Sequence, residues 1–295
     1  MVVGTVAVDA SDVGSVIGSA INYSPLYAVR LVGTLDRTIG FGTYCLMRGI
    51  YFPILAVLCW AAPALAMPLP DCAGPVLRAN ANVLRISDDG GLVLGDGRIA
   101  LLEGIRLPDR GPLKAQALAR LAELSKDGVT LTAVPPGEDR YGRMRVQGFG
   151  HDWMQVTLLE EGLARVDIAP DRNDCAPDLY EAEDRARARH RGGWAQTAWS
   201  SRSAQQMTGT VGTFQIVDGW VANVGASGGR AFIDFSSDWR HGFSAIIAPG
   251  DRRAFKYFDL DGLMAKHVRI RGLVQSFRGR PQIALSNPAQ IEVLN

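Results

Sequence analysis

The sequence predicts an α+β protein that is mainly β. Apolar and polar residues alternate in short runs over Leu84–Ile86, Leu92–Leu94 and Ile99–Leu101, which is typical of half-buried strands. Gly95-Asp96-Gly97 separates the second run from the third and predicts a tight hairpin. Helical spacing appears only later in the chain. The strands therefore come first, and the helices pack against them.

Three later segments are predicted to be helices. The first begins at Pro112 and ends before Gly128, with apolar residues at helical spacing between them. The second spans Trp153–Glu161. The third spans Asp178–Arg191, where Asp178 is expected to cap the helix. Two ion pairs at i,i+4 spacing are expected on it, Glu181/Arg185 and Glu183/Arg187.

This order of elements predicts two small barrels in the chain from residue 67 onward. Residues 67–198 are expected to form a five-stranded barrel of the oligonucleotide-binding (OB) type with a helical cap. Residues 199–207, WSSRSAQQM, lack periodicity and are interpreted as a linker. Alternation resumes over residues 208–295 and predicts a second, OB-like β-barrel, with a helix-like insertion at Arg252–Met264. Four of its aromatic residues could stack on bases, although alternation favours a core position for the first two: Trp220, Phe232, Phe235 and Trp239.

The amino-terminal region has the pattern of a secretory signal. Met47-Arg48-Gly49 precedes the apolar run Ile50–Trp60, and Ala64-Leu65-Ala66 follows it. We predict that residues 47–66 are a signal peptide, that the protein is periplasmic or secreted, and that no stable transmembrane segment remains after cleavage. The alternative is a membrane anchor formed by an uncleaved 50–66 segment. Residues 1–46 resemble neither a domain nor a targeting sequence and are interpreted as a non-native extension.

Signal cleavage decides how the cysteines are interpreted. Cys45 and Cys59 are lost with the signal, which leaves Cys72 and Cys175. Two cysteines in an exported domain predict a disulfide. The alternative is a pair of free thiols in a cytosolic protein. A metal site is disfavoured because neither cysteine has a local histidine partner.

Several motifs share their order and spacing with one known family. The chain over Leu77–Gln196 resembles the thermonuclease family of staphylococcal-nuclease-like (SNase-like) domains. The segments that carry this resemblance are Asp96–Asp109, Asp139–Arg143, Leu158–Ala164 and Ala182–Trp194. Val268–Val274 and the closing strand resemble, more loosely, an OB-type barrel that is appended to bacterial members of the family.

The resemblance implies hydrolysis of DNA and RNA phosphodiesters. Family members use a bound Ca²⁺ ion, a carboxylate that activates water, and two arginines that stabilise the charged phosphorane. Asp109 falls at the position of that carboxylate, and Arg143 falls at the second arginine. Tyr141 and Arg140, in the same motif as Arg143, are predicted to bind the ligand. Arg143 has an alternative structural role as the partner of Asp109 or Asp139.

The match fails at the other functional positions. Leu101 stands where the family has its first arginine, and Arg106 stands where it has a calcium-binding Asp. Gly90 aligns with the second metal carboxylate, which Asp88 or Asp89 could replace only after a local shift. Loss of one preorganised charge typically costs about 10²–10³ in rate, so catalysis and Ca²⁺ binding are expected to be weak or absent.

Two functions from different classes remain. The first is an exported, non-catalytic binding or envelope-associated module, whose partners would be single-stranded nucleic acid, nucleotides or envelope proteins. The alternative is a Ca²⁺-dependent nuclease with a rearranged site. Net charge places any preference for polyanions in the last third of the chain, because residues 201–295 contain 11 Lys+Arg against 7 Asp+Glu, whereas residues 67–200 contain 17 against 20.

Overall fold

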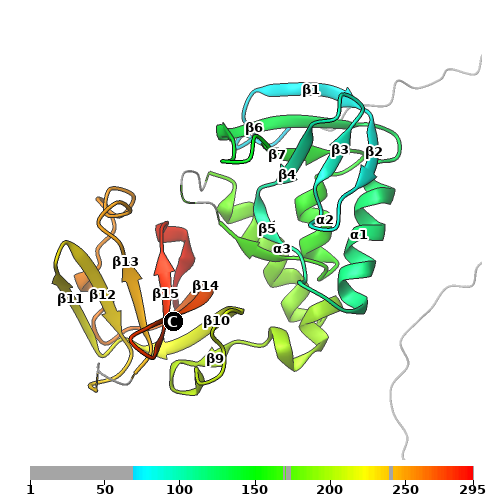
Figure 1. The fold of residues 1–295 in the computed structure, drawn as a ribbon. Coiled ribbons are helices and arrows are strands. Elements are labelled where there is room, and N and C mark those ends of the chain that lie inside the picture. The colour runs from blue at the N-terminus through cyan, green and yellow to red at the C-terminus, as the bar shows by residue number, and fades with distance from the viewer. Residues whose placement is uncertain (1–68, 169, 171–173, 239–241, 295) are drawn as a thin grey trace, which may run out of the picture. The chain divides into compact units, whose positions relative to one another are not determined.

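The computed structural model describes residues 69–168, 170, 174–238 and 242–294. These residues belong to one compact unit, Pro63–Asn295. The described chain is mixed α+β, mostly strands, with three α-helices and two curled half-barrel sheets (Figure 1). The predicted class is thereby confirmed. The predicted extension 1–46 and the predicted signal peptide 47–66 lie outside the described residues.

The first sheet has six strands, one more than the five predicted. The additional strand is β1, which pairs with β6; most of its side chains are exposed, so its sequence lacks the alternation of a half-buried strand. A separate two-stranded ribbon joins β5 to β8. In sheet order the strands are β1 (Val76–Ala81), β6 (Val129–Glu138), β7 (Met144–Phe149), β4 (Ile99–Leu102), β3 (Leu92–Leu94) and β2 (Val83–Ile86), and the ribbon is β5 (Gly104–Arg106) and β8 (Arg165–Asp167).

The three predicted helices are present as α1 (Pro112–Ser125), α2 (Met154–Glu160) and α3 (Ala176–Ala188). Helix α3 begins two residues earlier than expected, with Cys175 at its N-cap. Asp178 therefore does not cap the helix but lies in its first turn, where a carboxylate is favourable to the helix dipole. Within the described part of the chain, no helix is both long and apolar enough to cross a bilayer.

A disulfide joins the start of the first sheet region to the start of α3. The bond between Cys72 and Cys175 closes across a sequence separation of 103 residues. This confirms the predicted pairing. Because Cys175 is the N-cap of α3, the bond fixes that end of the helix against the chain that precedes β1.

The second sheet has eight strands. Its path runs from β11 to β9, with β16 added on β14. In the middle of this path β13 and β15 pair in parallel, and β10 and β14 form a long antiparallel ladder. The strands are β9 (Arg202–Ser203), β10 (Phe214–Trp220), β11 (Asn223–Ser227), β12 (Arg230–Asp234), β13 (Ser244–Ile247), β14 (His267–Phe277), β15 (Arg280–Leu285) and β16 (Ile291–Leu294).

Two segments differ from their expected form. The helix expected over Arg252–Met264 is wrong, because the chain forms turns and one short 3-10 helix, Asp261–Leu263. Asp259 accepts a hydrogen bond from the Gly262 N–H at 2.9 Å, and such a local bond favours a turn over a helix. The segment interpreted as a linker, 199–207, contains β9 and the short 3-10 helix Ala204–Gln206, and it begins at the last residue of another 3-10 helix, Thr197–Trp199.

Hydrophobic residues form two buried clusters. One lies between the first sheet and the three helices, and the other lies inside the second sheet. The core position expected for Trp220 is wrong: its side chain is 64% exposed and stacks on His267, its partner across the β10–β14 ladder. Phe235 is buried and Phe232 is half-buried, whereas Trp239 lies outside the described residues. Trp220 is the last residue of β10.

A buried ion-pair network connects α3 with the second sheet. The guanidinium of Arg271, on β14, contacts the Glu183 carboxylate at 2.7 Å, and it also contacts Glu292 on β16. Glu183 is fully buried; it pairs with Arg187 at 2.9 Å and accepts the Val166 N–H at 2.8 Å. The i,i+4 pair predicted on α3 is therefore present, but it is part of a longer network.

Candidate functional site

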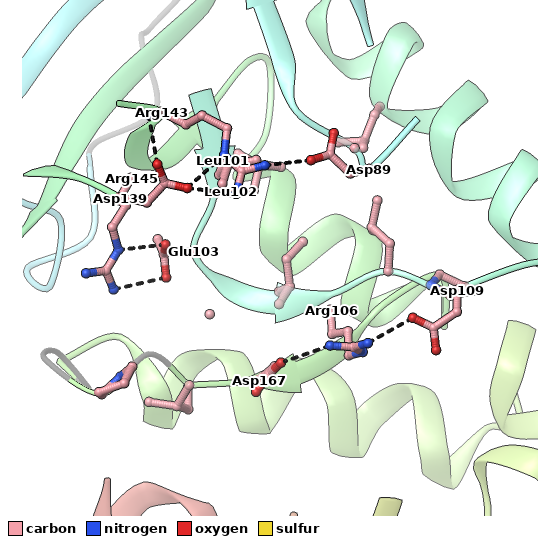
Figure 2. Close-up of a pocket in the computed structure, with 18 of the residues that line it drawn as sticks. Asp89, Leu101, Leu102, Glu103, Arg106, Asp109, Asp139, Arg143, Arg145 and Asp167 are labelled. Atoms are coloured by element: carbon pink, nitrogen blue, oxygen red, sulfur yellow. Dashed lines mark hydrogen bonds and ion pairs between the residues drawn. The ribbon is translucent and has the colours of Figure 1, made fainter. Parts of the chain in front are cut away.

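A cleft of about 830 Å³ lies beside β4, β5 and β8. Figure 2 labels charged side chains of this cleft that come from β5, β7 and β8 and from the segments before β3, between β4 and β5, after β5 and before β7. The lining mixes acidic, basic and apolar groups. The charged residues that line it are Asp88, Asp89, Glu103, Arg106, Asp109, Lys114, Glu138, Asp139, Arg140, Arg143, Arg145 and Asp167. Ser286 and Gln290 from the second sheet region complete the wall.

The β4–β5 segment delivers Asp109 to this cleft as the sequence predicts. Strand β5 ends at Arg106, and Pro108 lacks the N–H needed to continue a ladder. The chain therefore turns outward, and the side chain of Asp109 is 60% exposed at the mouth. Leu101, on β4, lines the same cleft.

Arg106 lies between two carboxylates. Its guanidinium contacts Asp109 at 2.9 Å and Asp167 at 3.8 Å (Figure 2). Burial raises the pKa of Asp167 above its ordinary value, although Arg106 and Arg165 both oppose the shift. Both carboxylates thus face a permanent cation, which stands where the resemblance places a metal ligand.

Arg143 is held by two other carboxylates. It contacts Asp139 and Asp89, each at 2.7 Å. The hydrogen bond from Ser87, opposed by burial and assisted by the charge of Arg143, lowers the pKa of Asp89. Burial opposes ionisation of Asp139, but hydrogen bonds from Arg143 and Tyr141 outweigh it and lower the pKa of Asp139. Of the two partners expected for Arg143, the structure has Asp139 and not Asp109.

The Tyr141 ring does not itself line the cleft but lies beside the guanidinium groups of two residues that do. Its side chain is 67% exposed, and the ring is 4.8 Å from the Arg140 guanidinium carbon and 5.4 Å from that of Arg143. Asp139 shapes this turn by accepting the Tyr141 and Arg143 backbone N–H groups at 2.8 and 2.9 Å. The predicted binding residues Tyr141 and Arg140 are therefore adjacent to Arg143.

The structure adds a pair that sequence reasoning missed. Arg145 on β7 lies directly opposite Leu101 on β4, and it pairs with Glu103 at 2.7 Å. Both residues line the cleft. The sequence contained a signal for this pair, because Arg145 is a charged residue between the apolar residues Met144 and Val146 of a predicted strand. In the structure all side chains of that strand are buried.

The site therefore consists mainly of arginine–carboxylate pairs. Among the described residues, no group of three or more His, Cys, Asp or Glu residues gathers in a geometry that could hold a metal ion. The five carboxylates that pair with cleft arginines are Asp89, Glu103, Asp109, Asp139 and Asp167. Asp109 and Arg143 line one cleft but contact different partners.

No protein-family model matches the chain, and no curated protein matches it either. The likeness to the thermonuclease family therefore rests on the quoted motifs alone.

Proposed function

We propose that the protein is an exported, non-catalytic binding module with an SNase-like first half and an OB-like second half. The observation that carries this proposal is Arg106, which occupies the place of a metal ligand and pairs with Asp109 and Asp167. A calcium ion requires several oxygen ligands and net negative charge. The donor set of this cleft does not fit Ca²⁺, because Asp89, Asp109, Asp139 and Asp167 already pair with arginines, and among the described residues no group of three or more His, Cys, Asp or Glu residues could hold a metal ion.

We propose nucleotides or single-stranded nucleic acid as the ligand class. Tyr141 presents an exposed ring on which a base could stack, and stacking contributes about 1–3 kcal/mol per base. Arg140, also exposed, lies against that ring and offers a charge for a phosphate. These two groups stand outside the paired centre of the cleft, so they are accessible without breaking an ion pair.

Export is part of the proposal. The Cys72–Cys175 disulfide supports it, because structural disulfides persist mainly in oxidising compartments. A periplasmic or secreted location agrees with the signal-like pattern at residues 47–66. Envelope proteins are the partner class that this location offers.

A rearranged nuclease is the alternative, and one observation favours it. Arg145 stands directly across the ladder from Leu101, so a guanidinium is present one strand away from the position of the missing arginine. Its bidentate pairing with Glu103, at 2.7 and 3.3 Å, opposes this role, since that pair would have to open before Arg145 could reach a phosphate.

The decisive experiment is digestion of single-stranded DNA by the purified mature chain with added Ca²⁺. We expect no cleavage above background, and we expect Arg143→Ala to leave that background unchanged. The double variant Leu101→Arg/Arg106→Asp should bind Ca²⁺ more tightly than the natural protein by calorimetry. Digestion by the natural protein that is abolished by Asp109→Ala or Arg143→Ala would overturn the non-catalytic proposal.

Binding is tested separately with a fluorescently labelled oligonucleotide and anisotropy. Tyr141→Ala should weaken binding about fivefold to 100-fold, as expected for one lost stacking contact. The matched control is Tyr257→Ala, because Tyr257 is the more exposed tyrosine (91%) but the cation against its ring, Lys256, does not line the cleft. Equal affinities for the natural protein and Tyr141→Ala would contradict the proposed ligand site.

A further inference from the structure

Two arginines face each other across the β5–β8 ribbon next to the cleft. Arg106 and Arg165 are direct partners in the antiparallel register, and both guanidinium groups lie over the Phe214 ring, at 5.5 and 4.7 Å. Arg165 is only 6% exposed and is enclosed between Phe214 and Trp199, whose ring is 4.9 Å away. Two like charges are therefore held close together in a largely dry environment.

Arg165 lacks the compensation that a buried charge normally has. Among the described residues no carboxylate lies within ion-pair distance of it, and its one hydrogen bond is to the Phe214 carbonyl oxygen at 3.3 Å. The Nε atoms of both Arg106 and Arg165 are buried without a hydrogen-bond partner. Burial, together with the neighbouring Arg106, lowers the pKa of Arg165 to about 10.

Asp109 is the more exposed of the two carboxylates that pair with Arg106. Its carboxylate contacts Arg106 at 2.9 Å, but its side chain remains 60% exposed. An exposed ion pair contributes little, typically about 0–1 kcal/mol. Asp109 can therefore leave Arg106 at little cost, and a ligand anion that enters from the cleft can take its place.

We propose that Arg106 forms an oxyanion site, which binds a phosphate or carboxylate group of the ligand in the cleft in place of Asp109, and that the neighbouring buried charge of Arg165, which does not itself line the cleft, adds to the positive potential there. This inference rests on the proposed function, because it assumes that the cleft holds the ligand. It reverses the sign of the ion at this position relative to the family, from a bound cation to a bound anion. Hydrogen bonds between guanidinium groups and oxyanions are charge-assisted and therefore strong.

The test uses inorganic phosphate as the probe and the thermal midpoint of the full mature chain as the readout. Phosphate should raise the midpoint in a saturable manner, whereas chloride at equal ionic strength should not. Acetate in a parallel titration distinguishes a site for carboxylates from one selective for phosphate. Asp109→Asn should bind the preferred anion about tenfold more tightly, because it removes the competing carboxylate.

Two further variants separate a binding role from a structural one. Arg106→Gln removes the guanidinium that lines the cleft and should abolish the saturable shift, whereas Arg165→Met removes the neighbouring buried charge and should weaken it. Arg98→Gln, a matched loss of charge at an exposed pair with Asp96 outside the cleft, should leave the shift unchanged. If Arg165→Met does not fold, Asp109→Asn alone still decides, because Asp109 is exposed.

The inference is overturned if neither phosphate nor acetate shifts the midpoint of the natural protein and of Asp109→Asn. It is also overturned if Arg106→Gln retains the full shift. Its failure is distinguishable from that of the proposed function, since oligonucleotide binding that depends on Tyr141 can persist without an anion effect. Conversely, a saturable phosphate shift in a protein that binds no oligonucleotide would support the oxyanion site alone.

Discussion

Arg165 and Arg271 are both buried arginines, yet their surroundings differ. Arg271 is 1% exposed and contacts the carboxylates of Glu183 and Glu292. Arg165 is 6% exposed and has aromatic rings and one carbonyl oxygen as its neighbours. The fold thus supplies Arg271 with anionic partners, whereas among the described residues it supplies none to Arg165.

The pKa values of the two groups move in opposite directions for this reason. Burial disfavours the charged form of both. At Arg271 the charges of Glu183 and Glu292 outweigh burial and raise the pKa above its usual range. At Arg165 the nearest strong influence is another cation, Arg106, which adds to the effect of burial. A buried charge that the fold satisfies stabilises structure, whereas one that it leaves unsatisfied is available to a ligand.

The largest predicted effect on stability is that of Arg271→Met, and Arg165→Met is the variant to compare with it. Arg271→Met leaves buried Glu183 with one partner fewer and should lower the free energy of unfolding by about 3–5 kcal/mol. Arg165→Met removes a charge that has no acid partner and should change that free energy by less than about 1 kcal/mol, because lost cation–π contacts offset the relieved burial. Urea unfolding of both variants gives the two values.

Equal destabilisation by the two substitutions would contradict the distinction. It would mean that Arg165 contributes through packing between Trp199 and Phe214 as much as Arg271 does through its ion pairs. The same titrations check that the m-value is unchanged, so that a shifted midpoint reports stability and not an altered denatured state.

Much of the fold was predictable because its signals are local. The alternation over Leu92–Leu94 and Ile99–Leu102 and the intervening Gly95–Gly97 turn all arise from neighbouring residues. Proline at the start of α1 acts over one turn in the same way. Strand β1 was missed, since its exposed side chains leave no alternating pattern.

The candidate site was predictable only in part. Asp109, Arg143 and Tyr141 lie within short motifs that can be recognised from the sequence. Asp109 and Arg143 line the cleft, and Tyr141 lies beside Arg143. The pair Arg145–Glu103 joins residues 42 positions apart, and the pair Arg271–Glu183 joins residues 88 positions apart. Such contacts depend on strand register and on how sheets pack, which periodicity does not specify.

A smaller effect is expected when one acid of the Arg271 network loses its charge. Glu183→Gln keeps the size of the side chain but weakens its bonds to Arg271 and Arg187, so unfolding should become easier by about 2–3 kcal/mol. Glu181→Gln is the matched control on the same helix, because its pair with Arg185 is exposed. Chemical denaturation of both should show a change of no more than about 0.5 kcal/mol for the control. Similar losses in the two variants would argue against a special role for the buried network.

The smallest effect concerns the acids beside two other arginines, Asp218 with Arg269 and Asp167 with Arg106. Burial opposes ionisation of Asp218, but hydrogen bonds from Arg269 and Ser201 outweigh it and lower its pKa, whereas burial raises the pKa of Asp167. Asp218 therefore contributes stability that is present above its unfolded pKa and lost as pH falls through its lowered folded value.

Asp167 has the opposite sign. Its raised folded pKa means that ionisation costs stability as pH rises through that value, and the cost is absent at pH below the unfolded pKa. Asp218→Asn should lower the thermal midpoint by about 2–4 °C at pH 7, with a difference from the natural protein that shrinks toward pH 3. Asp167→Asn should raise the midpoint at pH 7 and lose that gain toward pH 3. Melting curves at intervals between pH 3 and pH 7 measure both, and parallel pH profiles for the two variants would show that the cleft acid is as well compensated as the acid in the second sheet.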